Sequence, residues 1–231
     1  MKFFYSAAVM GYGGGRWWHR KYNFPKLSRV TKSLTILPKI GFPFAVVVVG
    51  NSVWNRVSLH NIGFFKWLDE YSDHEDFGKI IVSLAGHDHQ IDYMVEMLED
   101  YSDIGGIELN FSCPNIRRFE NKKVSKSKHN LYLKLRYDMD PFSYDLDRVH
   151  GIRLNSVPLL FGGGSGKVAQ EKNWTFIKKF NKEGLNVAGC SLMSVEDIAK
   201  LCDMGCKEIG LGSVVLTNPK LVERIGVEEQ I

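Results

Sequence analysis

The chain lacks a long hydrophobic run, which limits where the protein can reside. Its longest apolar run, residues 44–49, is far shorter than the roughly 20 residues that a membrane-spanning helix needs. The first residues also include no apolar stretch of signal-peptide length before Gly11. We therefore expect neither a membrane anchor nor secretion, and we favour a cytoplasmic location.

Cysteine is scarce, and its spacing argues against a metal centre. The four cysteines are Cys113, Cys190, Cys202 and Cys206, and none forms a Cys-x-x-Cys pair. Cys202 and Cys206 have no nearby histidine or further cysteine that would complete a metal site. We expect reduced thiols, as in a cytoplasmic protein, and no bound metal.

No strong excess of charge is present either. The chain has 30 Lys and Arg against 26 Asp and Glu, a net charge of +4, and its basic residues are mostly scattered. A nucleic-acid partner would require a denser basic stripe, so we expect none. The 231 residues contain no repeat, low-complexity tract or interdomain linker, and we predict one domain over residues 1–231.

What the chain does contain is a series of short apolar runs, each followed by Gly, Asn or Ser. Several are continuous instead of alternating, as expected for strands buried on both faces. The runs cover residues 3–9, 33–37, 79–84, 106–111, 131–135, 151–154, 185–188 and 208–211.

Helical patterns separate several of these runs. Residues 92–98 and 174–180 are amphipathic, and Ser194, followed by two acids, marks a helix start. Eight strand candidates with intervening helices predict an α/β fold, a parallel (β/α)8 TIM barrel. The connections 17–30 and 138–149 are too short or too polar for a full helix, so we expect a trimmed barrel.

The most informative segment is Ile-Glu-Leu-Asn-Phe-Ser-Cys-Pro-Asn at residues 107–115. A strand-like run ends in two asparagines that bracket Cys113, and strand ends are where parallel α/β folds present catalytic groups. The cysteine could act as a nucleophile, a metal ligand or a proton-transfer base. Asparagine amides can both donate to and accept from a planar, amide-rich ligand.

This segment resembles the active-site segment of the dihydroorotate dehydrogenases, the FMN enzymes of pyrimidine synthesis. The resemblance extends over essentially the whole chain, in collinear order. Further matching motifs are Ser-Ala-Ala-Val-Met-Gly-Tyr-Gly at 6–13, Thr-Lys-Ser-Leu-Thr at 31–35, Asn-Arg-Val-Ser-Leu-His-Asn-Ile-Gly at 55–63, Val-Ser-Leu-Ala-Gly at 82–86, Lys134, Asn155-Ser156, Gly-Gly-Gly-Ser-Gly at 162–166 and Gly-Leu-Gly-Ser at 210–213.

The resemblance implies a flavin-dependent oxidation of dihydroorotate to orotate. Cys113 would be the thiolate base, assisted electrostatically by Lys32. The expected substrate-binding residues are Lys32, Asn55, Val57, Ser58, Leu59, Asn110, Asn115, Asn155 and Ser156. The expected FMN-binding residues are Ala7, Ala8, Lys32, Ser33, Asn110, Lys134, Gly163, Gly164, Ser165, Gly166, Cys190, Ser191, Gly212 and Ser213. Residues 162–166 are interpreted as a loop that offers backbone N–H groups to a phosphate.

The chain departs from the family pattern where glycine is expected. Cys190-Ser191-Leu192 stands where the family usually has Gly-Gly-Ile beside the FMN phosphate, Ala8 replaces a glycine beside the flavin, and Ser58 replaces another. Each change adds a side chain where a close approach of backbone to ligand is expected.

The residue type of the base suggests a subclass. A cysteine base without an N-terminal extension resembles the soluble, class 1-like enzymes, which are homodimers or pass electrons to a partner protein. We expect a homodimer, and Gly11-Tyr12-Gly13 slightly favours the partner-dependent kind. Two alternatives stay open: a related flavoenzyme acting on another dihydropyrimidine, and a catalytically silent barrel that serves as a structural or interaction protein.

Overall fold

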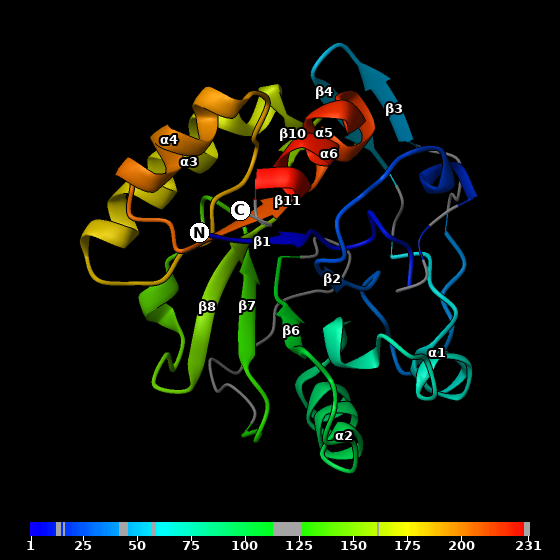
Figure 1. The fold of residues 1–231 in the computed structure, drawn as a ribbon. Helices are drawn as coiled ribbons and strands as arrows, with labels where there is room; N and C mark the ends of the chain where they lie inside the picture. Colours follow the sequence, from blue (N-terminus) through cyan, green and yellow to red (C-terminus); the bar gives the residue numbers. More distant parts are fainter. Residues whose placement is uncertain are drawn as a thin grey trace.

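Seven parallel strands form the central sheet and curl into a nearly closed barrel (Figure 1). The computed structural model describes residues 1–12, 15, 17–41, 46–56, 59–112, 126–160 and 162–228. In sheet order the strands are β11 (Glu208–Leu211), β1 (Lys2–Tyr5), β2 (Ser28–Val30), β5 (Ile80–Leu84), β6 (Gly106–Asn110), β7 (Leu131–Leu135) and β8 (Val149–Leu154).

Residues 185–189 close the gap between the two edge strands. Val187 forms a parallel bridge to Ile152 of β8, and Gly189 forms one to Ile209 of β11. The Ala188 amide donates to the Ile152 carbonyl, and the Gly189 amide donates to the Glu208 carbonyl, both at 2.8 Å. This segment therefore occupies the position of the eighth strand, and the predicted trimmed TIM barrel is confirmed.

The second predicted strand was misplaced. The apolar run at 33–37 is not a strand; the strand is β2, directly before it, and Leu34 forms only an isolated bridge to Leu84. The sequence of β2 mixes polar and apolar residues, and the segment is a strand because it pairs with β1 and β5. Arg29, which interrupts its apolar pattern, is held by an ion pair with Asp76 at 2.9 Å.

A smaller antiparallel sheet lies beside the barrel and was not predicted. Its strand order is β3 (Val46–Val49), β4 (Ser52–Asn55), β10 (Gly162–Gly166) and β9 (Val157–Leu159). The glycine-rich segment predicted to be a loop is therefore a central strand. Glycine suits it because a Cβ at Gly162 would lie 2.4 Å from the Asn55 carbonyl oxygen.

The helices lie outside the strands, and three of them contain the predicted helical segments (Figure 1). These are α2 (Asp88–Leu98), α3 (Lys167–Lys182) and α4 (Val195–Asp203), the last with a capping box between Ser194 and Asp197. The remaining helices are α1 (Phe64–Tyr71), α5 (Ser213–Thr217) and α6 (Pro219–Glu228), with short 3-10 turns η1 (Trp17–Lys21), η2 (Phe77–Lys79) and η3 (Pro141–Ser143).

The two trimmed connections are also as expected. Between β1 and β2 the described residues form only η1, and between β7 and β8 they form only η3. Within the described ranges, no helix is long and apolar enough to cross a membrane.

Candidate functional site

A cavity of about 1130 Å³ lies at the carboxyl ends of the barrel strands, bounded on one side by the small sheet. Parallel barrels gather functional side chains at this end because every strand points toward it. Most of the residues predicted for the site line this cavity: Ala7, Ala8, Lys32, Ser33, Asn55, Leu59, Asn110, Lys134, Asn155, Ser156, Gly163, Ser165, Gly166, Cys190, Ser191, Gly212 and Ser213.

Five of the predicted site residues are not among those that line this cavity. Gly164 is not part of the cavity wall, and a Cβ there would meet Leu159 at 2.6 Å instead. Cys113, Asn115, Val57 and Ser58 lie outside the described residues.

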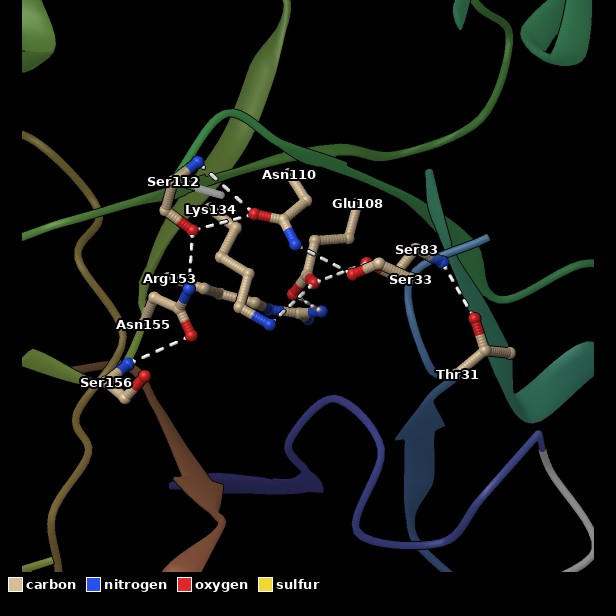
Figure 2. A network of polar contacts seen from close by, with 10 residues as sticks. All are labelled: Thr31, Ser33, Ser83, Glu108, Asn110, Ser112, Lys134, Arg153, Asn155 and Ser156. Carbon is tan, nitrogen blue, oxygen red and sulfur yellow. Dashed lines mark hydrogen bonds and ion pairs between the residues drawn. The ribbon is translucent and has the colours of Figure 1, made fainter. Parts of the chain in front are cut away.

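Two asparagines at the ends of barrel strands, Asn110 and Asn155, belong to one hydrogen-bonded network (Figure 2). Asn110, at the end of β6, donates through Nδ2 to Ser33 Oγ at 2.7 Å. Its Oδ1 accepts from Ser112 Oγ at 2.7 Å, and Ser112 Oγ in turn accepts from Asn155 Nδ2 at 2.7 Å. Two cavity-lining amides from different strands are therefore held in defined orientations.

Behind these amides lies a buried group of four charges. Lys134 Nζ is 3.4 Å from Glu108 Oε1, and Glu108 Oε2 is 3.7 Å from Arg153 Nη1. Arg153 Nη2 continues to Glu208 Oε2 at 3.8 Å. Two cations thus balance two carboxylates, which is the condition for burying charge at moderate cost.

Arg153 is the most deeply buried of the cations. Its guanidinium carbon lies 4.1 Å from the Phe4 ring centroid and 3.7 Å from that of Tyr132, so the cation is sandwiched between two rings. Burial lowers the pKa of Arg153, and the neighbouring carboxylates, Glu108 first, oppose that shift.

The two lysines predicted for the site occupy different surroundings. Lys134 is 8% exposed, and Glu108 is its ion-pair partner among the described residues. Lys32 lies over the Tyr12 ring, 5.5 Å from its centroid. Both line the cavity, so it can offer positive charge from two strand ends.

Sequence reasoning missed several residues that shape the cavity. Ser112 lies within residues 107–115 but was not predicted to be a site residue, although its hydroxyl links the amides of Asn110 and Asn155. Asn173 of α3 also lines the cavity, and its Nδ2 donates to Cys190 Sγ at 3.4 Å and Ser191 Oγ at 3.3 Å. Since α3 and the Cys190 loop are distant in sequence, only the fold reveals that pairing.

Cys190 is a neutral wall group. Burial raises the pKa of its thiol to about 11, although hydrogen bonds from Ser191 and Asn173 partly oppose the shift. Its carbonyl accepts from Trp174 Nε1 at 2.9 Å. A thiol held in this way is a poor nucleophile at neutral pH.

Three non-glycine residues at the cavity adopt left-handed backbone conformations. Ala8 has φ 69°, Leu59 has φ 56° and Ser191 has φ 59°. Such conformations cost L-residues roughly 1–2 kcal/mol and are normally occupied by glycine. The turns at Ala8 and Ser191 therefore keep glycine-like backbone at positions where the family pattern has glycine.

The fold and the cavity define a class: a β/α barrel with a cavity, lined by lysine and asparagine side chains among others, at the carboxyl ends of its strands. Solved structures of this kind confirm the fold. A dihydroorotate dehydrogenase from Eimeria tenella in complex with ferulenol matches with a TM-score of 0.72 and 12% identity, covering 100% of this chain and 80% of that one. The ligand-free enzyme from the same organism gives a TM-score of 0.67 at 13% identity, over 87% and 76% of the respective chains.

Sequence comparison points to the same family over part of the chain. Three curated relatives are catalytic subunits of dihydroorotate dehydrogenase B (NAD(+)). The Geotalea uraniireducens protein is 29% identical over 93 residues, and that of Endomicrobium trichonymphae 33% over 95; each match covers 38% of this chain and 30% of the relative. The Bacillus pumilus protein is 30% identical over 118 residues, 46% of this chain and 36% of the relative.

Over these segments the chain is distantly similar in sequence to the dihydroorotate dehydrogenases. The matched segments span about a third of each curated relative. No protein-family model matches the chain.

The left-handed backbone at Ala8 generates a first prediction. Ala8→Gly should raise the free energy of unfolding by about 0.5–1 kcal/mol, because glycine adopts positive φ without a Cβ clash. Ala7→Gly, one residue earlier and outside the left-handed region, is the matched control and should lower it by a similar amount. Urea denaturation measures the free energy of unfolding of both variants. A loss of stability in Ala8→Gly as well as in Ala7→Gly would contradict a strained backbone at Ala8.

The thiols of Cys190 and Cys206, whose pKa is raised, generate a second prediction. At about pH 8, iodoacetamide should modify exposed Cys202 at least about 100-fold faster than Cys190, whose pKa is raised to about 11. Cys206, whose pKa burial raises to about 12, should resist equally. Peptide mapping by mass spectrometry follows each site separately. Labelling of Cys190 at the rate of Cys202 would show that the cavity wall is open at that loop.

Proposed function

We propose that this chain is an FMN-dependent dihydroorotate dehydrogenase-like oxidoreductase, which oxidises dihydroorotate to orotate in pyrimidine biosynthesis. One observation carries the proposal. The cavity at the strand ends brings together two lysines and three asparagines that the family resemblance assigns to flavin and pyrimidine: Lys32, Lys134, Asn55, Asn110 and Asn155. The distant homology to the dihydroorotate dehydrogenases points the same way.

The chemistry of the cavity wall suits FMN. Lys134 offers a buried ammonium group, and Asn110 offers an amide, to the acceptor-rich ring system of a flavin. When bound, FMN supplies the hydride acceptor for oxidation of a CH–CH bond. The proposed ring contacts come from Ala7, Ala8, Lys32, Ser33, Asn110 and Lys134.

The phosphate is proposed to lie at the opposite side of the cavity. Backbone and hydroxyl groups there come from the end of β10, from the loop before α4 and from the end of β11. The proposed phosphate contacts are Gly163, Ser165, Gly166, Cys190, Ser191, Gly212 and Ser213. Gly164 is left out because it does not reach the cavity.

The substrate and its base complete the proposal. Cys113, three residues beyond Asn110 in the sequence, would accept the ring proton at Sγ, with Lys32 favouring the thiolate. The asparagine amides would hold the imide edge, and Lys32 the carboxylate. The proposed substrate contacts are Lys32, Asn55, Val57, Ser58, Leu59, Asn110, Asn115, Asn155 and Ser156.

We further propose a cytoplasmic homodimer that passes electrons to a partner protein. The name shared by the three curated relatives, a catalytic subunit of an NAD(+)-type enzyme, favours a partner over direct use of a small oxidant.

A silent barrel with a structural or interaction role is the second candidate. Its support is the strained turn at Ser191, where a side chain and the contact from Asn173 occupy a position that the family pattern keeps as glycine. If these groups fill the phosphate end, FMN cannot bind.

Anaerobic titration of the purified, FMN-supplemented protein with dihydroorotate separates these candidates. We expect the visible flavin bands to bleach with the wild type and with Cys202→Ala, but not with Cys113→Ala, because only Cys113 is proposed to take the proton. Lys32→Ala should abolish bleaching by dihydroorotate.

Two outcomes would contradict the proposal in different ways. Bound flavin that dihydroorotate does not bleach but dihydrouracil does, in the wild type and in Lys32→Ala, would identify the enzyme that acts on another dihydropyrimidine. Protein that binds no flavin at all would favour the silent barrel.

A further inference from the structure

The hydrogen bonds behind the cavity form a chain that ends on a carboxylate (Figure 2). Asn110 Nδ2 donates to Ser33 Oγ at 2.7 Å. Ser33 Oγ lies 2.9 Å from Ser83 Oγ, where geometry alone allows either hydroxyl to donate. Ser83 Oγ donates to Glu108 Oε1 at 2.9 Å.

Glu108 resolves the direction of the ambiguous contact. It is 1% exposed and ion-paired with Lys134 and Arg153, so it is a carboxylate, and a carboxylate only accepts hydrogen bonds. Ser83 must therefore donate its single hydroxyl proton to Glu108. Ser33 must then donate to Ser83, and its oxygen is left to accept from the amide of Asn110.

The same direction continues on the far side of Asn110. With Nδ2 turned to Ser33, Oδ1 accepts from Ser112 Oγ at 2.7 Å and from the Ser112 amide at 3.2 Å. The Ser112 hydroxyl proton is now used, so its oxygen accepts from Asn155 Nδ2 at 2.7 Å. Asn155 Oδ1 in turn accepts from the Ser156 amide at 2.9 Å.

Asn110 Oδ1 therefore has both lone pairs engaged by Ser112, whereas Asn155 Oδ1 is turned to the Ser156 amide and keeps one lone pair. Each NH2 group has two N–H bonds and uses one of them in the chain. Among the described residues, no acceptor pairs with the second N–H of Asn110 or Asn155, and both residues line the cavity.

We propose that Glu108 is a positioning residue, which acts through Ser83 and Ser33 to fix Asn110 and Asn155 as hydrogen-bond donors toward the cavity. The ring recognised there must then present acceptor oxygens, as a pyrimidine-dione does. A ring with an amino group facing the second N–H of Asn110 is rejected, because two donors would meet. The choice of a pyrimidine rests on the proposed function, whereas the direction of the chain does not.

Thermal unfolding of the ligand-free protein tests the direction. Asn110→Asp places an acceptor against Ser33, whose proton is committed to Ser83, so the melting temperature should fall by about 4 °C or more. Ser83→Ala releases that proton, and Ser33 can then donate to the new carboxylate. In the Ser83→Ala background we therefore expect Asn110→Asp to lower the melting temperature by at least about 2 °C less than it does in the wild type.

Two further variants serve as backgrounds for Asn110→Asp. They distinguish an effect of hydrogen-bond direction from an effect of the Glu108 charge and from a general loss of stability. Glu108→Gln can donate to Ser83 and reverse the chain, so it should also reduce the cost of Asn110→Asp. Ser83→Ala keeps the negative charge of Glu108, so relief there cannot come from reduced repulsion. Thr31→Val removes a hydroxyl that accepts from the Ser83 amide at 3.0 Å, outside the chain, and should give no relief. Equal costs in all four backgrounds would overturn the proposal.

A second measurement applies where Asn110→Asp does not fold. In amide spectra of nitrogen-15-labelled protein, Ser83→Ala should shift the side-chain N–H signals of Asn110, while Thr31→Val should leave them in place. Unchanged signals in Ser83→Ala would overturn the proposed direction.

The consequence for ligands is measured by calorimetry. The wild type should bind orotate more than about 100-fold tighter than the analogue in which an amino group replaces one ring oxygen, and Ser83→Ala should narrow that ratio. An unchanged ratio in Ser83→Ala would overturn the role of Glu108 in ligand choice. If orotate does not bind but the unfolding results hold, the proposed function fails and the positioning role stands.

Discussion

The carboxylate of Glu108, buried inside the barrel, is the constraint on which the site depends. Such a charge is tolerated only where cations and hydrogen-bond donors meet it, and here Lys134, Arg153 and Ser83 do so. These partners come from nearby strands, so the ion pairs and the Ser83 hydrogen bond together require β5, β6, β7 and β8 to keep their register. Breaking one pair would leave a buried, uncompensated charge, at a cost of roughly 3–5 kcal/mol.

The cavity takes its chemical character from this buried group. Glu108 holds the Lys134 ammonium at the end of β7 and polarises the hydroxyl chain that leads to Asn110 and Asn155. Core and cavity are therefore one electrostatic unit, in which the barrel interior sets what the strand ends can recognise. At Ala8 and Ser191 the backbone adopts left-handed conformations that glycine normally occupies.

Much of this arrangement could be predicted from the sequence, for identifiable reasons. Strands such as β5, β6 and β7 are buried on both faces and appear as continuous apolar runs. The segment around Asn110 stood out because polar residues follow such a run directly. The strand β2 was missed because pairing, not composition, makes it a strand, and β10 because its glycines are used for close contact between strands and not for a turn. The role of Glu108 depends on contacts between strands, which no local pattern reveals.

The proposed function depends first on flavin recognition, which direct binding tests most simply. Titrating the purified, flavin-free protein into FMN and into riboflavin, and following the quenching of flavin fluorescence, needs neither substrate nor partner. We expect one FMN to bind per chain and riboflavin to bind at least about tenfold more weakly, because part of the cavity wall is assigned to the phosphate. Absence of quenching by either flavin would contradict it.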